Sequence, residues 1–397
     1  MSFSWLSPVQ RRFTWSRKIW HLSGGKPNGR VRMAAAARRN RGSTPEHDKT
    51  FIRCPNRRCR RLHPIDGRST LHSILAKSCR CGVSLYDPRR PRSDSPRPGL
   101  VLDQGSGTEL FEKIGEGAMG IVYCGRSNYE RVAIKTSKSA FEDPRFAKEF
   151  LLASLAFRSL RKEHGSPAIP QPLVLCVDPF PYYTMQLIEG NCHEINDHSL
   201  FDTSVVDSPA RLREQLQLLL PLAHALAAMH KRGLIHCDLK PANILVRDSD
   251  GESQAFLIDF GIANHRSELN AMTQLGQYFY TPRYAPPEQR EPTRSRQNPA
   301  TDVFSFGCIC FELLTGCHPF GVLDSGKQRT LSSAAYEELL LRRIVDPIAE
   351  PTLARTLRPD LPAALEALLA EATSRDALDR PSSAELRDRL SRQIRQL

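Results

Sequence analysis

Residues 234–245 read LIHCDLKPANIL and decide how the rest of the sequence is interpreted. They place Asp238 and Asn243 five residues apart in a loop between two apolar runs. A carboxylate can accept a proton from a hydroxyl group, and an amide oxygen suits a hard cation such as Mg²⁺. Lys240 lies between them, where its charge can neutralise an anionic group. Asp and Asn are also common turn residues, so the argument depends on the whole set rather than on either residue.

A second stretch, residues 257–261, reads LIDFG, an apolar strand that ends in Asp259 and a turn. Phosphoryl transfer requires a positioned metal, base and charge rather than covalent chemistry, and the two stretches together supply these groups. In this order they resemble the eukaryotic-type serine/threonine protein kinase family, with HCD at residues 236–238 in place of the usual HRD. The resemblance covers Thr108 to about Leu390.

This resemblance implies an α+β fold of the bilobal protein kinase type, with a small β-rich N-lobe and a large helical C-lobe. It identifies Asp238, Lys240 and Asn243 as catalytic residues, and Asn243 and Asp259 as ligands of Mg²⁺. ATP would donate the phosphoryl group, and Ser or Thr hydroxyls of protein substrates would accept it.

A glycine-rich segment begins the kinase-like region. Its G-x-G-x-x-G spacing lets the backbone approach a triphosphate closely, although flexible hairpin turns also have this pattern. Residues 132–135, VAIK, follow at the distance expected for the next-but-one strand, and Lys135 would hold the α- and β-phosphates of ATP. The expected nucleotide-covering residues are Ile114, Gly115, Glu116, Gly117, Ala118, Met119, Gly120, Ile121 and Val122.

Residues 145–160 have the apolar spacing of a largely buried helix. Glu149 in this helix is the acidic residue best placed to pair with Lys135, and Glu142, which lies before the helix, is the alternative.

The sequence YTMQLIEG at residues 183–190 resembles the strand and hinge that join the two lobes. Met185 would be the gatekeeper residue, and the backbone from Gln186 to Ile188 would face the adenine.

The end of the activation segment is recognisable at residues 281–288, TPRYAPPE. Tyr280 precedes this motif where the family usually has glycine. Arg380 matches the family's arginine that pairs with the glutamate of the motif, here Glu288. The presence of Lys240 and Thr281 at these positions resembles the pattern of serine/threonine kinases rather than that of tyrosine kinases.

Cys237 departs from the family pattern. Most members have arginine before the catalytic aspartate, and this arginine binds a phosphate on the activation segment. Cysteine has neither a positive charge nor a planar donor group. We therefore expect activity that does not depend on a phosphate at Thr273 or Thr281, unless Arg266 or Arg283 binds that phosphate instead.

The net charge of +13 comes from the N-terminal quarter of the chain. Residues 1–100 contain 23 Lys and Arg against 5 Asp and Glu, a balance of +18, which leaves −5 for the remainder. Residues 1–50 are basic and lack periodicity, which predicts a disordered segment or a start at Met33. Its arginines and tryptophans also fit a transit peptide, or an arm that contacts a membrane surface or nucleic acid.

Residues 51–86 contain a cluster of four cysteines. Four thiolates can surround one tetrahedral Zn²⁺, so the segment predicts a zinc-ribbon-like module with the ligands Cys54, Cys59, Cys79 and Cys81. The spacings C-x4-C and C-x-C differ from the usual C-x2-C, and His63 is an alternative ligand. Four free cysteines in a basic segment are the other interpretation.

The remaining boundaries follow from composition. Residues 87–107 are rich in Pro and Arg and predict an extended linker, which leaves residues 108–390 for the kinase domain. The eleven cysteines are odd in number and mostly scattered, which favours a reducing compartment such as the cytoplasm. The sequence contains no apolar run of about 18 residues, so no membrane span is predicted.

Two other functions fit parts of the pattern. A small-molecule phosphotransferase of the aminoglycoside-kinase type shares the H-x-D-x-x-x-x-N loop, but usually has His at the position of Lys240 and lacks counterparts of residues 281–288 and Arg380. A non-catalytic scaffold could keep the kinase fold. No catalytic residue is missing, which favours an active kinase, with the cysteine module as a possible contact for a regulatory partner.

Overall fold

The computed structural model describes residues 50–54, 59, 61–65, 78–81, 96–103, 106–116, 120–137, 149–154, 156–157, 168–176, 181–202, 208–249, 251–260, 264–265, 280–290, 298–321 and 332–397. The basic segment 1–49 therefore lies outside the described residues, as do Gly117, Ala118, Met119, Glu142, Arg266 and Thr273. The chain forms two compact units, which divide at residues 143/144, 172/173 and 186/187.

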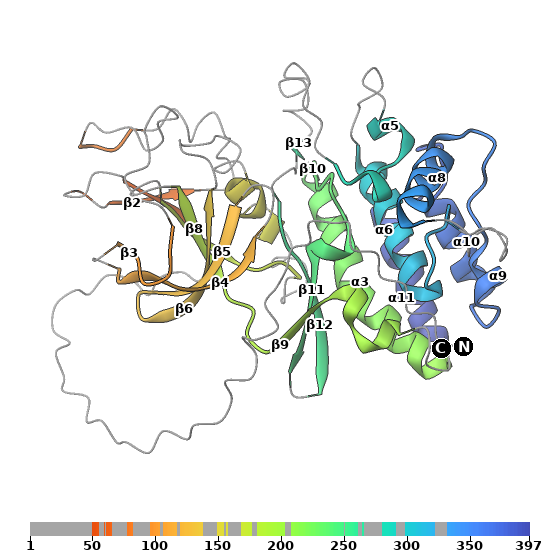
Figure 1. Cartoon of the computed structure of the whole chain (residues 1–397), viewed down its shortest axis with the longest axis horizontal. Coiled ribbons are helices and arrows are strands. Elements are labelled where there is room, and N and C mark those ends of the chain that lie inside the picture. The colour runs from red at the N-terminus through yellow and green to blue at the C-terminus, as the bar shows by residue number, and fades with distance from the viewer. Residues whose placement is uncertain are drawn as a thin grey trace. The chain divides into compact units, whose positions relative to one another are not determined.

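The small unit is built on an eight-stranded sheet with the strand order β2-β1-β7-β8-β6-β5-β4-β3 (Figure 1). Leu110, Ile134 and Tyr182 form the centre of its core and are almost completely buried. The strands are β1 Thr50–Arg53, β2 Leu62–Ile65, β3 Val101–Asp103, β4 Thr108–Glu116, β5 Gly120–Ser127, β6 Glu130–Ser137, β7 Pro172–Cys176 and β8 Tyr182–Gln186.

Strands β4, β5 and β6 form an antiparallel meander. The turn between β5 and β6 consists of Asn128 and Tyr129, whose φ angles are 50° and 70°. Two consecutive residues with positive φ suit a two-residue hairpin, because this turn matches the right-handed twist of the strands. Strand β6 also pairs antiparallel with β8, so Lys135 lies opposite Val122 on one side and Tyr183 on the other.

A short hairpin, β1 and β2, extends this sheet beyond β7. Strand β1 runs parallel to β7, with Phe51 opposite Val174 and Ile52 opposite Leu175. The sequence predicted a separate zinc-ribbon-like module at residues 51–86, whereas both described strands of that segment belong to the sheet of the small unit. Likewise β3 lies within the predicted linker 87–107, where Leu102 is buried in the core.

The large unit is mainly helical. A three-stranded sheet of order β12-β11-β9 and a two-stranded sheet of β10 and β13 accompany the helices. The elements are β9 Asn191–Glu194, η2 Ile195–Asp197, η3 Ser199–Phe201, α3 Pro209–Lys231, β10 Leu234–Ile235, η4 Pro241–Asn243, β11 Ile244–Ser249, β12 Glu252–Leu257, β13 Asn264–His265, η6 Pro282–Tyr284, α5 Pro287–Arg290, α6 Pro299–Thr315, α8 Ser333–Val345, α9 Ala354–Leu357, α10 Ala363–Ala372 and α11 Ser383–Gln396.

Helix α6 lies at the centre of the large unit, and nearly all its residues are buried. It begins with a capping box formed by Asn298 and Thr301, followed by Pro299 at the first turn. These residues satisfy backbone amides that would otherwise lack partners. Gly316 ends the helix with a φ of 76°, a conformation that glycine adopts without strain. The helix therefore has defined ends as well as an apolar surface.

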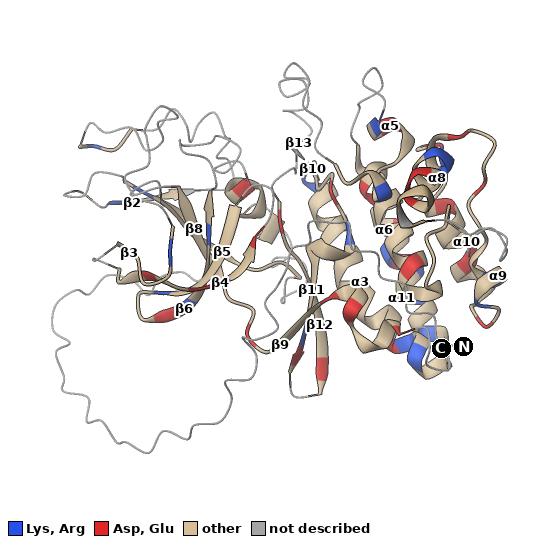
Figure 2. Cartoon of the chain, viewed as in Figure 1, with Lys and Arg blue, Asp and Glu red and all other residues tan. Residues whose placement is uncertain are grey.

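Helices α3, α10 and α11 pack around this core. Helix α11 begins with a capping box of Ser382 and Glu385, and its buried positions include Leu386 and Leu390. Its opposite face carries arginines, which Figure 2 shows near the C terminus. None of the described helices is both long and apolar enough to span a membrane. The α+β architecture with a β-rich small unit and a helical large unit confirms the predicted fold class.

Candidate active site and candidate metal site

The loop at residues 236–243 lies between β10 and β11 of the large unit and includes η4. Cys237 has a φ of 67°, which is uncommon for a residue with a side chain. The amides of His236 and Cys237 donate to the Asp302 carboxylate at 2.7 and 2.8 Å. Gln289 donates to the carbonyl oxygen of Cys237 at 2.8 Å. The loop is thus fixed by two residues, Asp302 and Gln289, whose contacts with the loop were not predicted from the sequence.

Asp302 is buried at the start of α6 and is held as a carboxylate. Burial acts to raise the pKa of Asp302, but the hydrogen bonds from His230 and from the backbone amide of His236 lower it by a larger amount, so the net pKa is below its ordinary value. The His230 ring contacts Asp302 at 2.8 Å and Ser383 at 2.8 Å. Two backbone amides and one imidazole therefore stabilise this charge. Residues 302–307, DVFSFG, resemble the start of the family's buried large-lobe helix, and this resemblance was the sequence signal for Asp302.

Asp238 forms the centre of a hydrogen-bonded group. Its Oδ1 accepts from both the backbone amide and the hydroxyl of Thr281, at 2.8 and 2.6 Å. Its Oδ2 accepts from Lys240 Nζ at 2.8 Å, and the same Nζ donates to Thr281 Oγ1 at 3.0 Å. The structure therefore brings Asp238 and Lys240 of the loop into contact with Thr281 of the segment 281–288. The sequence could relate these two parts of the chain only by resemblance.

Asn243 is attached to Asp238 through its amide nitrogen. Its Nδ2 donates to the carbonyl oxygen of Asp238 at 2.8 Å and lies 3.5 Å from the Asp238 carboxylate. Its Oδ1 is buried and has no hydrogen-bond partner among the described residues. A buried amide oxygen without a partner is costly, and it is the kind of oxygen that a hard cation binds.

Asp259 follows β12 and is tied to the same loop through the backbone. The amide of Ile258 donates to the carbonyl oxygen of Asn243 at 2.9 Å. Asp259 itself has a φ of 66°, a conformation in which non-glycine residues are strained and which occurs often at functional sites. The next residue, Phe260, packs on the ring of His236 with centroids 5.3 Å apart.

His236 is a neutral imidazole at the base of this site. Burial lowers its pKa, and the charges of Asp302, Asp238 and Asp259 oppose the effect without reversing it. A pKa below its ordinary value keeps the ring uncharged at neutral pH. His236 thus supports Phe260 by packing and adds no positive charge near the carboxylates.

The small unit carries the residues expected to contact the nucleotide. Lys135 is only 3% exposed and lies on β6 between β5 and β8. Ile114 and Val122 are buried, whereas Ile121 is half-buried. Met185 lies on β8 opposite Ala133. Gly115, Glu116 and Gln186 are described, and Gly117 to Met119 are not. Ile188, the other residue expected beside the adenine, is buried and belongs to the large unit.

Gly120 has a second reason to be glycine. A Cβ atom at this position would lie 2.4 Å from the carbonyl oxygen of Thr136 on the neighbouring strand. The close approach of β5 and β6 therefore requires glycine here, whether or not a nucleotide binds. The glycine pattern alone is weaker support for nucleotide binding than the sequence indicated.

Glu149, the expected partner of Lys135, is buried in the large unit at 1% exposure. Lys135 belongs to the small unit. Their pairing remains a prediction, as does the closure of a nucleotide site by residues of both units.

The activation-segment end is fixed by a half-buried ionic group. Arg283 donates to Glu312 at 2.5 Å and to Glu337 at 3.1 Å, and the Tyr284 hydroxyl donates to Glu312 at 2.7 Å. Burial acts to raise the pKa of Glu312, but the charge of Arg283 lowers it below its ordinary value. Arg283 is therefore already paired with two carboxylates.

The predicted pair of Glu288 and Arg380 is confirmed. Two nitrogens of Arg380 donate to the two oxygens of Glu288 at 2.6 and 3.0 Å. Arg380 also donates to the carbonyl oxygens of Ser374, Ala300 and Arg375. This bidentate pair joins α5 to the segment just before α11 and is structural.

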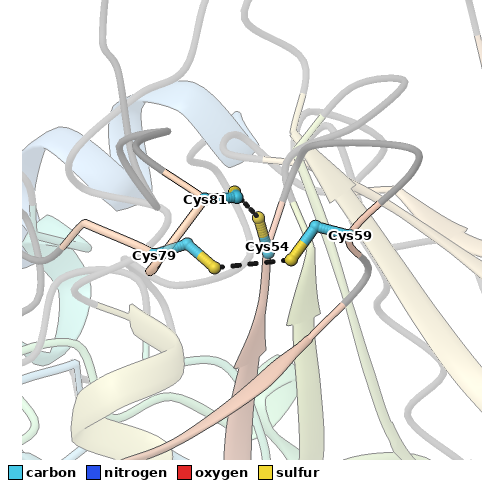
Figure 3. Close-up of side chains that lie close together, drawn as sticks. All are labelled: Cys54, Cys59, Cys79 and Cys81. Carbon is cyan, nitrogen blue, oxygen red and sulfur yellow. Dashed lines mark hydrogen bonds between the residues drawn. The ribbon is translucent and has the colours of Figure 1, made fainter.

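The four cysteines of residues 51–86 converge on one point (Figure 3). Cys54 and Cys81 have their sulfur atoms 3.5 Å apart, as do Cys59 and Cys79, and all four sulfurs lie within 4.8 Å of one another. A disulfide needs about 2.05 Å, whereas four sulfurs about 2.3 Å from one tetrahedral metal are separated by about 3.8 Å. His63, the alternative ligand, lies on β2 opposite Ile52 and is not one of the four.

Together, the β-rich unit with its buried lysine and the helical unit with its Asp-Lys-Asn loop define the class of protein kinases. The comparison with protein families agrees, because residues 108–389 match the family model described as protein kinase domain. The chain belongs to the protein kinase family.

Several curated relatives are bacterial. The chain is 32% identical to the serine/threonine-protein kinase pkn2 of Myxococcus xanthus, over 74% of this chain and 33% of the relative. It is 30% identical to the serine/threonine-protein kinase PknB of Mycolicibacterium smegmatis, over 53% of this chain and 33% of that protein. It is 28% identical to the probable serine/threonine-protein kinase PknB of Lactococcus lactis, over 70% and 40% respectively. The matches thus span about one third of the length of the first two relatives.

Proposed function

We propose that this chain is an active serine/threonine protein kinase, which transfers the γ-phosphate of ATP to Ser or Thr hydroxyls of protein substrates. The observation that carries the proposal is the group formed by Asp238, Lys240, Thr281 and Asn243, with a carboxylate, a cation and an unpartnered amide oxygen within one loop. The names of the bacterial relatives support the same substrate class.

In the proposed mechanism, Asp238 orients the substrate hydroxyl and accepts its proton. Lys240, bonded to Asp238, neutralises the charge of the transferred phosphoryl group. Thr281 holds Asp238 and Lys240 in position through its hydroxyl. Phosphoryl transfer depends mainly on such positioning and on charge stabilisation, so these short hydrogen bonds are the chemical contribution of the loop.

The residues present fit a magnesium ion. Asn243 Oδ1 and the carboxylate of Asp259 are the hard oxygen ligands that Mg²⁺ prefers, and Mg²⁺ would neutralise charge on the phosphates of ATP. Lys135 of the small unit would bind the α- and β-phosphates, and Glu149 would orient Lys135. The strands that flank Gly117 to Met119 would cover the nucleotide, with Met185, Gln186 and Ile188 beside the adenine.

The alternative of a small-molecule phosphotransferase is less well supported. The contacts of Thr281 with Asp238, and of Arg380 with Glu288, belong to a peptide-binding activation segment that such enzymes lack. A non-catalytic scaffold would not need a carboxylate, a lysine and a threonine in mutual contact.

The test is the rate of phosphate transfer from ATP to a generic protein substrate, followed by mass spectrometry of the modified residues. Asp259→Asn and Lys135→Met should each reduce this rate by orders of magnitude in a protein that is still folded. Asp388→Asn, an exposed change on α11, is the matched control. Transfer to an aminoglycoside but not to protein, or full activity of either variant, would contradict the proposal.

Control of this kinase should not depend on activation-segment phosphorylation. Cys237 cannot bind a phosphate as arginine does, Arg283 is occupied by two carboxylates, and the Thr281 hydroxyl is bonded to Asp238. Phosphatase treatment, verified by mass spectrometry, should leave the initial rate unchanged. A large loss of rate that rephosphorylation restores would contradict this assignment.

The four cysteines should bind one Zn²⁺ as a structural site. The number of sulfur atoms and the distances between them fit a mononuclear tetrahedral centre. Thiolates are required for this, which suits a reducing compartment such as the cytoplasm. Elemental analysis of the full chain, purified without chelators, should find one zinc per chain, and protein without metal would overturn this part of the proposal.

A further inference from the structure

The cysteine cluster lies at the end of a strand that belongs to the kinase sheet. Cys54 directly follows β1, and β1 runs parallel to β7, with Ile52 opposite Leu175. Ile52 and Leu175 are both at most 1% exposed. Without β1, strand β7 would present unpaired backbone groups at the edge of the sheet, and Leu175 would lose the neighbouring side chain of Ile52, which is unfavourable.

The hairpin is too small to hold this position by itself. Strands β1 and β2 have four residues each, and the register of β1 with β7 extends over two residue pairs. On β2, Leu62 and Pro64 are exposed, so the outer strand adds little to the core among the described residues. Isolated two-stranded hairpins are marginally stable in water, and this one needs a further constraint.

The cysteine cluster supplies that constraint. Cys54 and Cys59 lie on the connection between β1 and β2, and the amide of Cys54 donates to the carbonyl oxygen of Arg61 at 2.8 Å. Cys79 and Cys81 come from a separate segment. A metal bound by all four sulfurs would tie the loop of the hairpin to that segment and fix where β1 ends.

We infer that metal binding at Cys54, Cys59, Cys79 and Cys81 holds β1 on β7, and so makes the metal a structural part of the kinase sheet rather than of an independent module. This inference rests on the proposed zinc site and not on the proposed catalytic activity. The sheet order β1-β7-β8-β6 places two strands between β1 and Lys135. Loss of the metal therefore leaves β7 as an edge strand of the sheet that carries the nucleotide-binding lysine.

Hydrogen exchange measured by mass spectrometry on the full chain tests this inference. Removal of the metal with a chelator should increase exchange in peptides from β7, residues 172–176, and Zn²⁺ should restore protection. Peptides from α6 in the large unit are the internal reference and should not change. The melting temperature should fall when the metal is removed and recover when Zn²⁺ is added back, because a ligand that binds only the folded state stabilises that state.

Two variants separate the metal from the packing of the cysteines. Cys81 is exposed, so Cys81→Ser removes a ligand with little change in packing and should reproduce the exchange of the chelated protein. Cys317→Ser, outside the cluster and half-buried, should exchange like the wild-type chain.

The outcomes are distinct. Bound metal without any change in β7 exchange on its removal would overturn the inference and leave the zinc site intact. Protein that binds no metal would overturn both. Metal-dependent protection of β7 in a chain that transfers no phosphate would support the inference and refute the proposed kinase activity alone.

Discussion

Thr281 is expected to act in catalysis by positioning Asp238, and Thr281→Ala tests this directly. The change removes the hydroxyl that donates to Asp238 Oδ1 at 2.6 Å and accepts from Lys240 at 3.0 Å. It leaves the backbone amide of residue 281, which donates to the same oxygen at 2.8 Å. Asp238 therefore loses one of its two anchors on the activation segment.

The magnitude follows from the strength of this hydrogen bond. A hydrogen bond to a charged group contributes about 1.5–3 kcal/mol, and each 1.36 kcal/mol changes a rate by about tenfold. If the bond holds Asp238 in its reactive position, kcat should fall by roughly 10- to 150-fold. The backbone amide and Lys240 remain, so the lower part of this range is expected. KM for ATP should change little, since Thr281 is not one of the residues expected to bind ATP.

The assay is the initial rate of phosphate transfer to a protein substrate over a range of ATP concentrations. Thr281→Ser keeps the hydroxyl and should restore most of the rate, whereas Thr356→Ala, an exposed change on α9, should match the wild type. Circular dichroism and thermal melting verify that each variant is folded. A rate for Thr281→Ala within twofold of wild type, or equal rates for the Ala and Ser variants, would refute the positioning role.

Two further predictions concern stability. Arg380→Met leaves the carboxylate of Glu288 without its bidentate partner and should lower the free energy of unfolding by about 3–5 kcal/mol in denaturant titrations. Adding Glu288→Gln to this variant should reduce the loss of stability. Additive effects of the two changes on the free energy of unfolding would argue against the pair. Burial acts to raise the pKa of Asp248, but hydrogen bonds from Ser253 and His198 lower it below its ordinary value. The stabilisation from Asp248 should thus be complete above pH 3.8 and be lost as the pH falls further, so Asp248→Asn should flatten the acid limb of the stability curve; an unchanged limb would contradict the assignment.

The catalytic loop was predictable from sequence because its chemistry is local. Asp238, Lys240 and Asn243 lie within six consecutive residues, and their spacing alone brings them into one loop. The pair of Glu288 and Arg380 is separated by 92 residues, and it was expected only because each residue stands in a recognisable motif. Local spacing and resemblance together were sufficient for these two features of the large unit.

Contacts without a motif were not predictable in this way. The sequence offered Arg283 as a possible phosphate partner, but the structure commits it to Glu312 and Glu337, which lie on α6 and α8. No spacing rule relates these three residues. Similarly, Gly120 fits the nucleotide pattern, yet the approach of the Thr136 carbonyl already explains it. A motif position can therefore have a structural cause that the motif does not reveal.

The extension of the kinase sheet is the clearest case of a feature hidden from sequence. Four residues, TFIR, form β1, and alternation over so short a run does not identify a partner strand. The partner, β7, lies more than a hundred residues away, and parallel pairing at that distance is set by tertiary packing, here by Ile52 against Leu175. The cysteines were visible, but they indicated a module that folds around its own metal. Ile52, two positions before Cys54, favours a strand of the sheet over an independent module. Burying Ile52 requires an apolar surface that the cysteine segment does not itself provide.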